Sequence, residues 1–284
     1  MQLCILNWSF YICLFLSVCS ACTGIPGPFS IPIEKRRSKM QWDTRNLMQM
    51  NASDVDLSDY FNNEYVGLLG VGSPPQYLTV VFDTGSSDIW IPGRSCKSCG
   101  AHNSFDDTLS STFELSKGKH NKPASFVISY GSGSVEGSIG LDTVTLSAMS
   151  LTKVKVGIVT KEDSAIADFD MDGIVGLAFD GLSSVTTPNI LDEMAHTYAN
   201  LSESFAIYLS SDPDDHTKPS VVTFGGYDLS IVSPNATFHY APVVRDGPDF
   251  TYWMISMKSF AISTSFQFSS LEETKVAYSF CGKG

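Results

Sequence analysis

The sequence predicts an all-β protein, and three observations support this prediction. Short apolar or alternating runs, separated by turn residues, follow one another along most of the chain, as is typical of strands. Only one stretch carries the signals of a helix. Hydrophobic residues make up 43% of the 284 residues and charged residues 17%, which indicates a filled core and excludes a disordered chain. Many short strands with few helices predict a sandwich or a barrel.

Residues 1–22 are interpreted as a signal peptide. The stretch from Leu3 to Cys22 is mostly apolar, and no charged side chain precedes Glu34. The small residues Cys19 and Ala21 stand before the expected cleavage point. The alternative is an uncleaved anchor, because the apolar run approaches the length that spans a membrane. A signal peptide predicts entry into the secretory pathway and a secreted, lysosomal or vacuolar protein, with membrane attachment only if the segment stays uncleaved.

Residues 23–58 are expected to form a short basic pro-segment, as in a zymogen. Within residues 1–50 the basic residues outnumber the two acids, Glu34 and Asp43; they are Lys35, Arg36, Arg37, Lys39 and Arg45. The formal net charge of the whole chain is −12, so the body that follows is acidic, and its attraction for the pro-segment weakens as carboxylates are protonated in acid. The alternatives are a solvated linker and a dibasic processing site at Arg36-Arg37. The same acidity argues against a nucleic-acid partner.

The first strong strand prediction, at 76–82, leads to the residue that carries the chemistry. The turn Ser73-Pro-Pro75 precedes an alternating run that becomes apolar and ends at Asp83. Burial of a carboxylate there costs free energy unless hydrogen-bond donors surround it. The three residues that follow, Thr84, Gly85 and Ser86, can supply backbone N–H and hydroxyl donors, which favour the ionised form. The alternative is an Asx turn in which Asp83 only caps a loop.

Beyond residue 22 the chain keeps three cysteines, Cys96, Cys99 and Cys281. In an oxidising compartment two of them would pair and one would be left over. A local disulfide between Cys96 and Cys99 is preferred, because their Gly/Ser/Asn-rich surroundings do not resemble the helix start of a thioredoxin-type site. A zinc site that includes the nearby His102 would need a fourth ligand, for which only distant candidates exist.

The remaining elements follow from turn and cap signals. Residues 125–130 and 134–139 flank Gly131-Ser-Gly133 and predict a hairpin. A helix is expected at 189–198, directly after Pro188. Further strands are expected at 143–146, 154–159, 204–209, 221–224, 237–243 and 252–260. Three N-glycosylation sequons, at Asn51, Asn200 and Asn235, are compatible with a luminal protein.

Several longer strings together resemble the motifs of one known family. The first is Phe82-Asp-Thr-Gly-Ser-Ser-Asp-Ile-Trp90. The others are Tyr65-Val-Gly-Leu-Leu-Gly-Val-Gly-Ser-Pro-Pro-Gln76, Cys99-Gly-Ala-His-Asn-Ser-Phe-Asp106, Ser110-Ser-Thr-Phe-Glu114, Tyr130-Gly-Ser-Gly-Ser-Val-Glu-Gly137, Asp172-Gly-Ile-Val-Gly-Leu-Ala-Phe179, Phe224-Gly-Gly-Tyr-Asp228 and Tyr252-Trp-Met-Ile255. In order and spacing these strings are similar to those of pepsin-like aspartic proteases, from about Asp56 to about Phe260. The resemblance implies the acid-protease fold and hydrolysis of peptide bonds in acid.

The resemblance also implies roles for the residues of the first motif. Asp83 would be one of two aspartates that share a proton and activate a water molecule. Thr84 would join the two catalytic motifs beneath the site, Gly85 would allow the turn, and Ser86 would hydrogen-bond the outer oxygen of Asp83. The expected substrate is a peptide or protein. No metal or organic cofactor is implied, because water is the nucleophile.

A second group of residues would belong to a mobile flap over the site. The resemblance places Tyr130, Gly131 and Ser132 on this hairpin, where they would close over the substrate. Trp90 would fix the phenol of Tyr130. Without the motifs, ordinary core packing would explain both aromatic residues equally well.

A second D-[ST]-G motif, which the mechanism requires, is absent from the sequence. Only Asp83-Thr-Gly85 fits the pattern, and Phe280-Cys-Gly-Lys-Gly284 lies where the resemblance would place a cysteine shortly before the second motif. We therefore expect an essentially complete N-terminal catalytic lobe at 59–245 and the start of a truncated second lobe at 246–284. An aspartic endopeptidase by family, inactive as this chain, is the first hypothesis. A non-catalytic secreted glycoprotein or binding lobe is the alternative, and no homodimer is expected.

Overall fold

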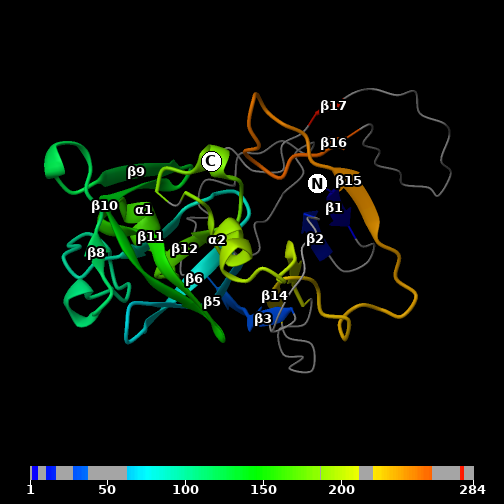
Figure 1. Ribbon diagram of the computed structural model, residues 1–284, viewed down its shortest axis with the longest axis horizontal. Helices are drawn as coiled ribbons and strands as arrows, with labels where there is room; N and C mark the ends of the chain where they lie inside the picture. Colours follow the sequence, from blue (N-terminus) through cyan, green and yellow to red (C-terminus); the bar gives the residue numbers. More distant parts are fainter. Residues whose placement is uncertain are drawn as a thin grey trace, which may run out of the picture.

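The computed structural model describes residues 2–5, 11–16, 28–37, 63–185, 187–210, 220–257 and 276–277. The main regular element among these residues is the β-strand, and the strands form two large sheets and one small one (Figure 1). The prediction of an all-β chain with few helices is confirmed.

The larger sheet has nine strands and carries the Asp83 motif. Its order is β4 (Glu34–Arg37), β5 (Asn63–Val71), β6 (Gln76–Asp83), β12 (Gly173–Gly176), β7 (Ile89–Pro92), β11 (Met149–Glu162), β10 (Gly133–Leu146) and β8 (Glu114–Leu115). The ninth strand, β9 (Ser125–Tyr130), pairs with β10. A second contact between β10 and β5 brings Val144 opposite Val71, so the two halves of the sheet curl toward each other.

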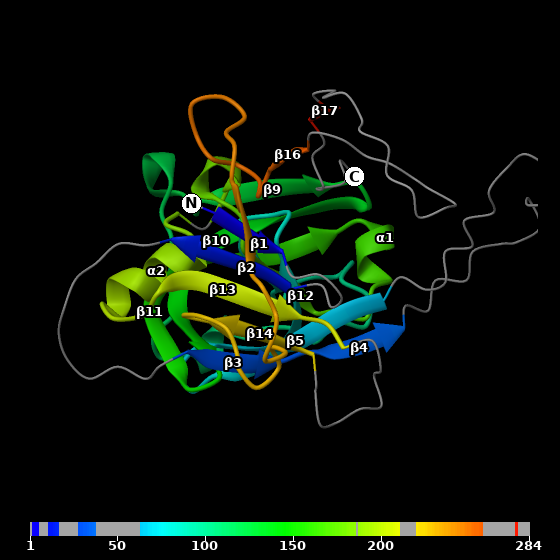
Figure 2. The ribbon, with the colours of Figure 1, turned by 90° about the vertical axis from the view of Figure 1, so that its right-hand side faces the viewer.

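The second sheet has six strands, most of which lie side by side in Figure 2. Its order is β15 (His239–Pro242), β1 (Gln2–Ile5), β2 (Tyr11–Leu16), β13 (Glu203–Tyr208), β14 (Val221–Phe224) and β3 (Phe29–Pro32). Strands β1 and β2 fall inside the segment that we interpret as a signal peptide, whose cleavage stays a prediction. A separate two-stranded sheet joins β16 (Ser256–Met257) to β17 (Val276–Ala277).

Helices are short and few among the described residues. They are α1 (Ser164–Ala167), α2 (Ile190–Thr197) and three 3₁₀ turns at Asp107–Leu109, Lys119–Asn121 and Asp180–Leu182. The side chain of Asn189 caps α2, because its oxygen accepts hydrogen bonds from the amides of Leu191 and Asp192. None of the described helices has the length and apolar character that would be needed to cross a bilayer.

Strand β12 gives the larger sheet the topology that positions the site. It lies between β6 and β7, parallel to the first and antiparallel to the second. A strand from a later part of the chain therefore separates two strands that are close in sequence. All four residues of β12 are buried, as expected for the centre of a sheet.

Two clusters of buried side chains hold these layers together. The larger one includes Leu69, Val80 and Phe82 from the nine-stranded sheet and Phe205 and Phe224 from the six-stranded sheet, so it fills the space between the sheets. The smaller one lies around Trp90 and packs β7 against the hairpin β9–β10 and the segment near α1; its buried members also include Val66, Phe126, Val135, Val159, Ile166 and Ile174. The site described next lies beside this smaller cluster.

The strand and helix predictions agree with the structure where the sequence signal was strong. The strands expected at 76–82, 125–130 and 221–224 are present, and the helix expected at 189–198 is present as α2. The runs at 134–139 and 143–146 belong to a single strand, β10, and the run at 154–159 lies inside the longer β11. The strand expected from Tyr252 was wrong at its start, because β16 begins only at Ser256.

Candidate active site

The carboxylate of Asp83 lies at the carboxyl end of β6, on a tight turn of the chain. Its Oδ1 accepts a hydrogen bond from the backbone N–H of Gly85 at 2.8 Å, and its Oδ2 accepts one from the hydroxyl of Ser86 at 2.6 Å. The two oxygens therefore have donors from the motif itself, as the sequence predicted. Thr84 is half-buried on the same turn. Asp83 is half-buried, so it is held in place and still accessible to a reactant.

Strand β12 and the two residues that follow it fix this turn from behind. The amide of Leu177 donates to the carbonyl of Asp83 at 2.7 Å, and the amide of Ala178 donates to the carbonyl of Ser86 at 2.8 Å. Gly176 makes this close approach possible, because a Cβ there would lie 2.5 Å from the backbone nitrogen of Asp88. The backbone of the Asp83 turn is thus locked by a glycine-containing strand more than ninety residues later in the sequence.

The hairpin β9–β10 places Tyr130 over the turn. Its phenolic oxygen accepts a hydrogen bond from the indole N–H of Trp90 at 2.8 Å, and Ser86 lies near the phenol. Trp90 therefore fixes the phenol of Tyr130 close to Ser86, and Ser86 in turn donates to Asp83. Burial raises the pKa of the Tyr130 phenol, and the nearby charge of Asp83 acts in the same direction. Tyr130 is therefore a neutral hydrogen-bonding group across the physiological range of pH.

The tip of this hairpin is a two-residue turn. Tyr130 pairs with Gly133, and the residues between them, Gly131 and Ser132, are exposed. Gly133 has a φ of +147°, and a Cβ there would lie 2.9 Å from the Cβ of Asp163, so glycine fits this position best. The predicted flap residues are thus brought together at one end of the hairpin, above the Asp83 turn.

The motif contains a second acid besides Asp83. Asp88 is the nearest acid in the sequence of the motif, but its carboxylate serves another purpose. It accepts hydrogen bonds from the hydroxyl of Ser183 at 2.6 Å and from the amides of Ser184 and Val185, both at 2.8 Å. Asp88 therefore ties the loop after Asp180–Leu182 to the motif and is engaged away from Asp83.

Sequence reasoning missed the role of Asp88 and that of Asp172. Asp172 is 4% exposed, and its carboxylate accepts hydrogen bonds from the amide and the hydroxyl of Thr79, at 2.8 and 2.6 Å. It also accepts one from the amide of Asn103 at 2.7 Å. Thr79 lies on β6, four residues before Asp83, so Asp172 joins β6 to the loop that carries the cysteines. The only sign of this role in the sequence was the position of an Asp directly before the apolar run 173–176.

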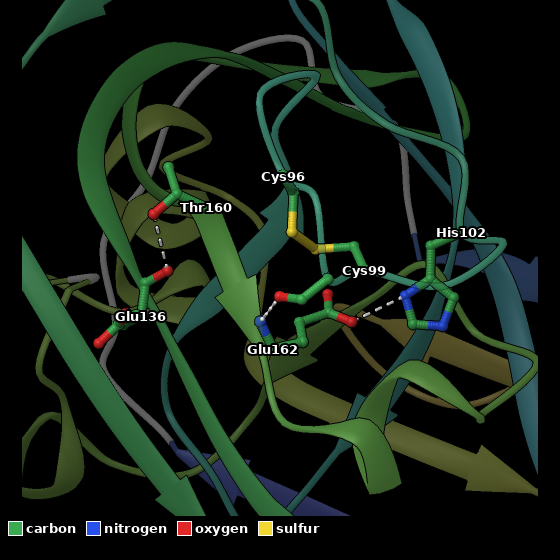
Figure 3. The surroundings of a disulfide bond; sticks show 7 residues. Cys96, Cys99, His102, Glu136, Thr160 and Glu162 are labelled. Atoms are coloured by element: carbon green, nitrogen blue, oxygen red, sulfur yellow. Dashed lines mark hydrogen bonds and ion pairs between the residues drawn. A yellow bond between two sulfur atoms is a disulfide. The ribbon is translucent and has the colours of Figure 1, made fainter.

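The cysteine motif forms a disulfide at the edge of the smaller core cluster. Cys96 and Cys99 are joined, with their Cα atoms 5.7 Å apart (Figure 3). In the part of the chain that the structure describes, no group of three or more His, Cys, Asp or Glu side chains is placed to hold a metal ion. Cys281 lies outside the described residues, as does the sequon at Asn51. The sequon residues Asn200 and Asn235 are both exposed.

Comparison with known proteins agrees with this geometry. The family described as eukaryotic aspartyl protease matches residues 64–277. Curated relatives include pepsin A from Canis lupus familiaris, which is 37% identical over 206 residues and covers 72% of this chain and 50% of the relative. Chymosin from Bos taurus is 35% identical over 214 residues, which are 74% of this chain and 52% of the relative.

A third relative is named as a glycoprotein and not as a protease. Pregnancy-associated glycoprotein 2 from Sus scrofa is 35% identical over 222 residues, which are 75% of this chain and 49% of the relative. The chain thus spans about half the length of the curated relatives it matches. From the family match, these identities and the Asp-Thr-Gly turn beneath the Tyr130 hairpin, we conclude that the chain belongs to the eukaryotic aspartyl protease family, with pepsin and chymosin among its relatives.

Proposed function

We propose that this chain provides the N-terminal catalytic lobe of an aspartic endopeptidase, with Asp83 as one of its two catalytic carboxylates. The observation that carries the proposal is the Asp83 carboxylate, which accepts hydrogen bonds from the Gly85 amide and the Ser86 hydroxyl beneath a hairpin whose Tyr130 is fixed by Trp90. These hydrogen bonds hold one carboxylate in a fixed orientation beneath a hairpin that can cover an extended peptide. The proposed substrate is a peptide or protein, cleaved in acid.

The chemistry needs a second carboxylate, which a D-[ST]-G motif would supply. In a pair of this kind one carboxylate takes a proton from the attacking water, and the other, protonated, stabilises the oxyanion that forms on the peptide carbonyl. Asp83 can perform one of these tasks but not both at once. Thr84 and Gly85 would shape the turn, and Gly131 and Ser132 would contact the substrate from the flap.

These 284 residues, expressed as one chain, should therefore show little or no proteolysis. The reason is that Asp83-Thr-Gly85 is the only D-[ST]-G motif in the sequence, so the proton held by the second carboxylate is missing. The measurement is release of fragments from an unfolded protein substrate between pH 3 and 6, beside canine pepsin A as the positive control. Cleavage that pepstatin inhibits and that the Asp83→Ala variant lacks would contradict this proposal.

A second candidate is a secreted glycoprotein that binds peptides without cleaving them. The exposed sequons at Asn200 and Asn235 support it, as does the similarity to a relative that is named a glycoprotein. The basic pro-segment and the signal peptide are compatible with both candidates, because each would enter the secretory pathway. A disulfide at Cys96–Cys99 also suits an oxidising compartment.

Expression in a secreting eukaryotic cell should attach N-glycans at Asn200 and Asn235, because both side chains are exposed in described loops. Treatment with peptide N-glycosidase F should then increase the electrophoretic mobility of the protein. Asn200→Gln and Asn235→Gln should each remove one step of that shift. An unchanged mobility of the secreted protein after treatment would show that these sequons are not used.

A further inference from the structure

A buried charged pair lies beside the disulfide, away from the Asp83 site. The side chain of His102 is 4% exposed and that of Glu162 is 0% exposed, and their atoms Nδ1 and Oε2 are 3.1 Å apart (Figure 3). His102 follows the Cys96–Cys99 bridge, and Glu162 is the last residue of β11. The proposed proteolytic chemistry uses neither residue.

The geometry around His102 suits the protonated ring. Its Nε2 lies 3.0 Å from the carbonyl oxygen of Phe169, and its Nδ1 faces the carboxylate of Glu162. When Glu162 is ionised, both neighbours present only acceptor oxygens, so the doubly protonated imidazolium, with an N–H at each ring nitrogen, is the form that suits both. Neither Nδ1 of His102 nor the Glu162 oxygens make a hydrogen bond of good geometry among the described residues, so the contact is an ion pair in which the charge of His102 compensates the carboxylate. A neutral ring would leave a buried carboxylate without that charge.

The other charged groups around this pair favour the same form of the ring. Asp172, from the segment before β12, adds negative charge near His102. On β11, Lys161 is turned outward and pairs with Glu136 of β10 at 3.2 Å. In the loop itself Lys97 is exposed, and at the start of α1 Asp163 is turned to Ser134. Asp168, which is exposed, and Asp170 flank Phe169 in the sequence.

This pair fastens the disulfide loop to the rest of the lobe. His102 contacts the end of β11 and the segment at Phe169, and the hydroxyl of Ser98, inside the bridge, accepts a hydrogen bond from the amide of Glu162 at 3.0 Å. The next residue, Asn103, donates to Asp172, which also binds Thr79 on β6. The loop is therefore held at His102 by an ion pair, and at Asn103 by a hydrogen bond from a neutral amide to Asp172.

We propose that His102 and Glu162 form a proton-dependent clasp, which together with the Cys96–Cys99 bridge keeps the disulfide loop docked in acid and weakens its docking as the pH rises past neutrality. The clasp would make the lobe more stable in an acidic compartment than at the cell surface. The inference does not rest on the proposed function, because it concerns stability and needs no catalysis.

The direction of the effect follows from proton linkage. Burial alone lowers the pKa of His102, but the contact with Glu162 and its charge, with the Phe169 carbonyl and Asp172, outweigh burial and raise it above 6.5. A group whose pKa is raised by folding contributes stability below its unfolded pKa. The contribution is therefore complete below about pH 6.5 and is lost as the pH rises through the pKa of the folded state.

The test compares denaturant unfolding of the full chain between pH 5.5 and 8.5 with that of two variants. In the unmodified chain the unfolding equilibrium constant should rise above pH 6.5, by up to about tenfold per pH unit from this one proton. In Glu162→Gln that rise should disappear or reverse, because burial then dominates and lowers the pKa of His102. The matched control is His196→Gln, on the exposed end of α2, which should keep the slope of the unmodified chain. A Glu162→Gln variant with that same slope would overturn the proposal.

A second measurement tests the proposal if the Glu162→Gln variant does not fold. The full chain is labelled on its histidines, and the imidazole of His102, assigned by comparison with His196→Gln and the other single histidine variants, is titrated by NMR. The proposal requires a midpoint above 6.5, together with a loss of amide protection at Asn103 over the same pH range after correction for intrinsic exchange. A His102 midpoint at or below 6.5, or protection at Asn103 that does not change, would refute the clasp.

Discussion

Replacement of Trp90 by alanine lowers the free energy of unfolding by about 3–5 kcal/mol, the range for removal of a large aromatic side chain from a packed core. Trp90 is fully buried and lies at the centre of the smaller core cluster. Its ring packs against Tyr130, with the ring centroids 6.5 Å apart, and its indole N–H donates to the phenol. The variant therefore removes packing and leaves the Tyr130 oxygen without its donor.

Two further variants separate the parts of this effect in urea unfolding. Trp90→Phe keeps much of the ring volume and removes the donor, so it should cost clearly less than Trp90→Ala, with about 1–3 kcal/mol from the lost hydrogen bond. Leu229→Ala is the control for a truncated apolar side chain that is 73% exposed, and it should stay within about 0.5 kcal/mol of the unmodified chain. A Trp90→Ala variant as stable as Leu229→Ala would show that the indole does not support the hairpin.

The strands that the sequence predicted well are those with one buried and one solvated face. In β6 the burial of successive residues alternates, and the sequence pattern alternates with it. Strands β7 and β12 were not predicted as strands from their pattern, because every residue in each is buried and no alternation exists. Each is also only four residues long, so neither reaches the length that would distinguish a strand from any other apolar run.

A glycine lies where two predicted runs proved to be one strand. Gly140 falls between the runs expected at 134–139 and 143–146 and interrupts the apolar pattern of β10. In the structure a Cβ at Gly140 would lie 2.4 Å from Cε2 of Phe113, and the register between β10 and β11 shifts between Asp142 and Val144. The glycine thus marks a close approach of a neighbouring side chain within a continuous ladder, which a single sequence cannot distinguish from a turn.

The contacts of the candidate site are likewise of two kinds: some join residues close together in the sequence, and others join residues far apart in it. The hydrogen bonds of Asp83 come from residues two and three positions later, so a short string of sequence could predict them. The partners of Asp88 lie 95 to 97 positions away, and only the fold shows that this acid binds a loop. The pairing of His102 with Glu162 is of the second kind. The sequence presented His102 as a possible metal ligand, whereas the structure gives it a buried carboxylate as its partner.

In an active setting, Asp83→Asn should lower kcat by at least about 10³-fold, within the range for loss of a general acid or base. The setting is a chimaera in which residues 64–257 replace the matched half of canine pepsin A, whose other half would supply the second carboxylate. Asparagine keeps the size of the side chain and can still accept a hydrogen bond from Ser86, but it cannot take a proton from water. KM should change little, because the substrate contacts of the flap are unaltered.

The matched control for this prediction is Asp107→Asn, a carboxylate that is 46% exposed and lies 3.9 Å from Nε of Arg94 at the surface. It makes the same chemical change without touching the Asp83 turn, so the chimaera that carries it should keep its kcat.

Asp88→Asn separates the structural role of the other acid in the motif from the role of Asp83. It should destabilise the chimaera by weakening the three hydrogen bonds to the 183–185 loop, while the pH profile of the remaining activity stays unchanged. A folded chimaera in which Asp83→Asn retains a tenth or more of its kcat would show that catalysis does not pass through this carboxylate, because no described residue offers a substitute in the same position.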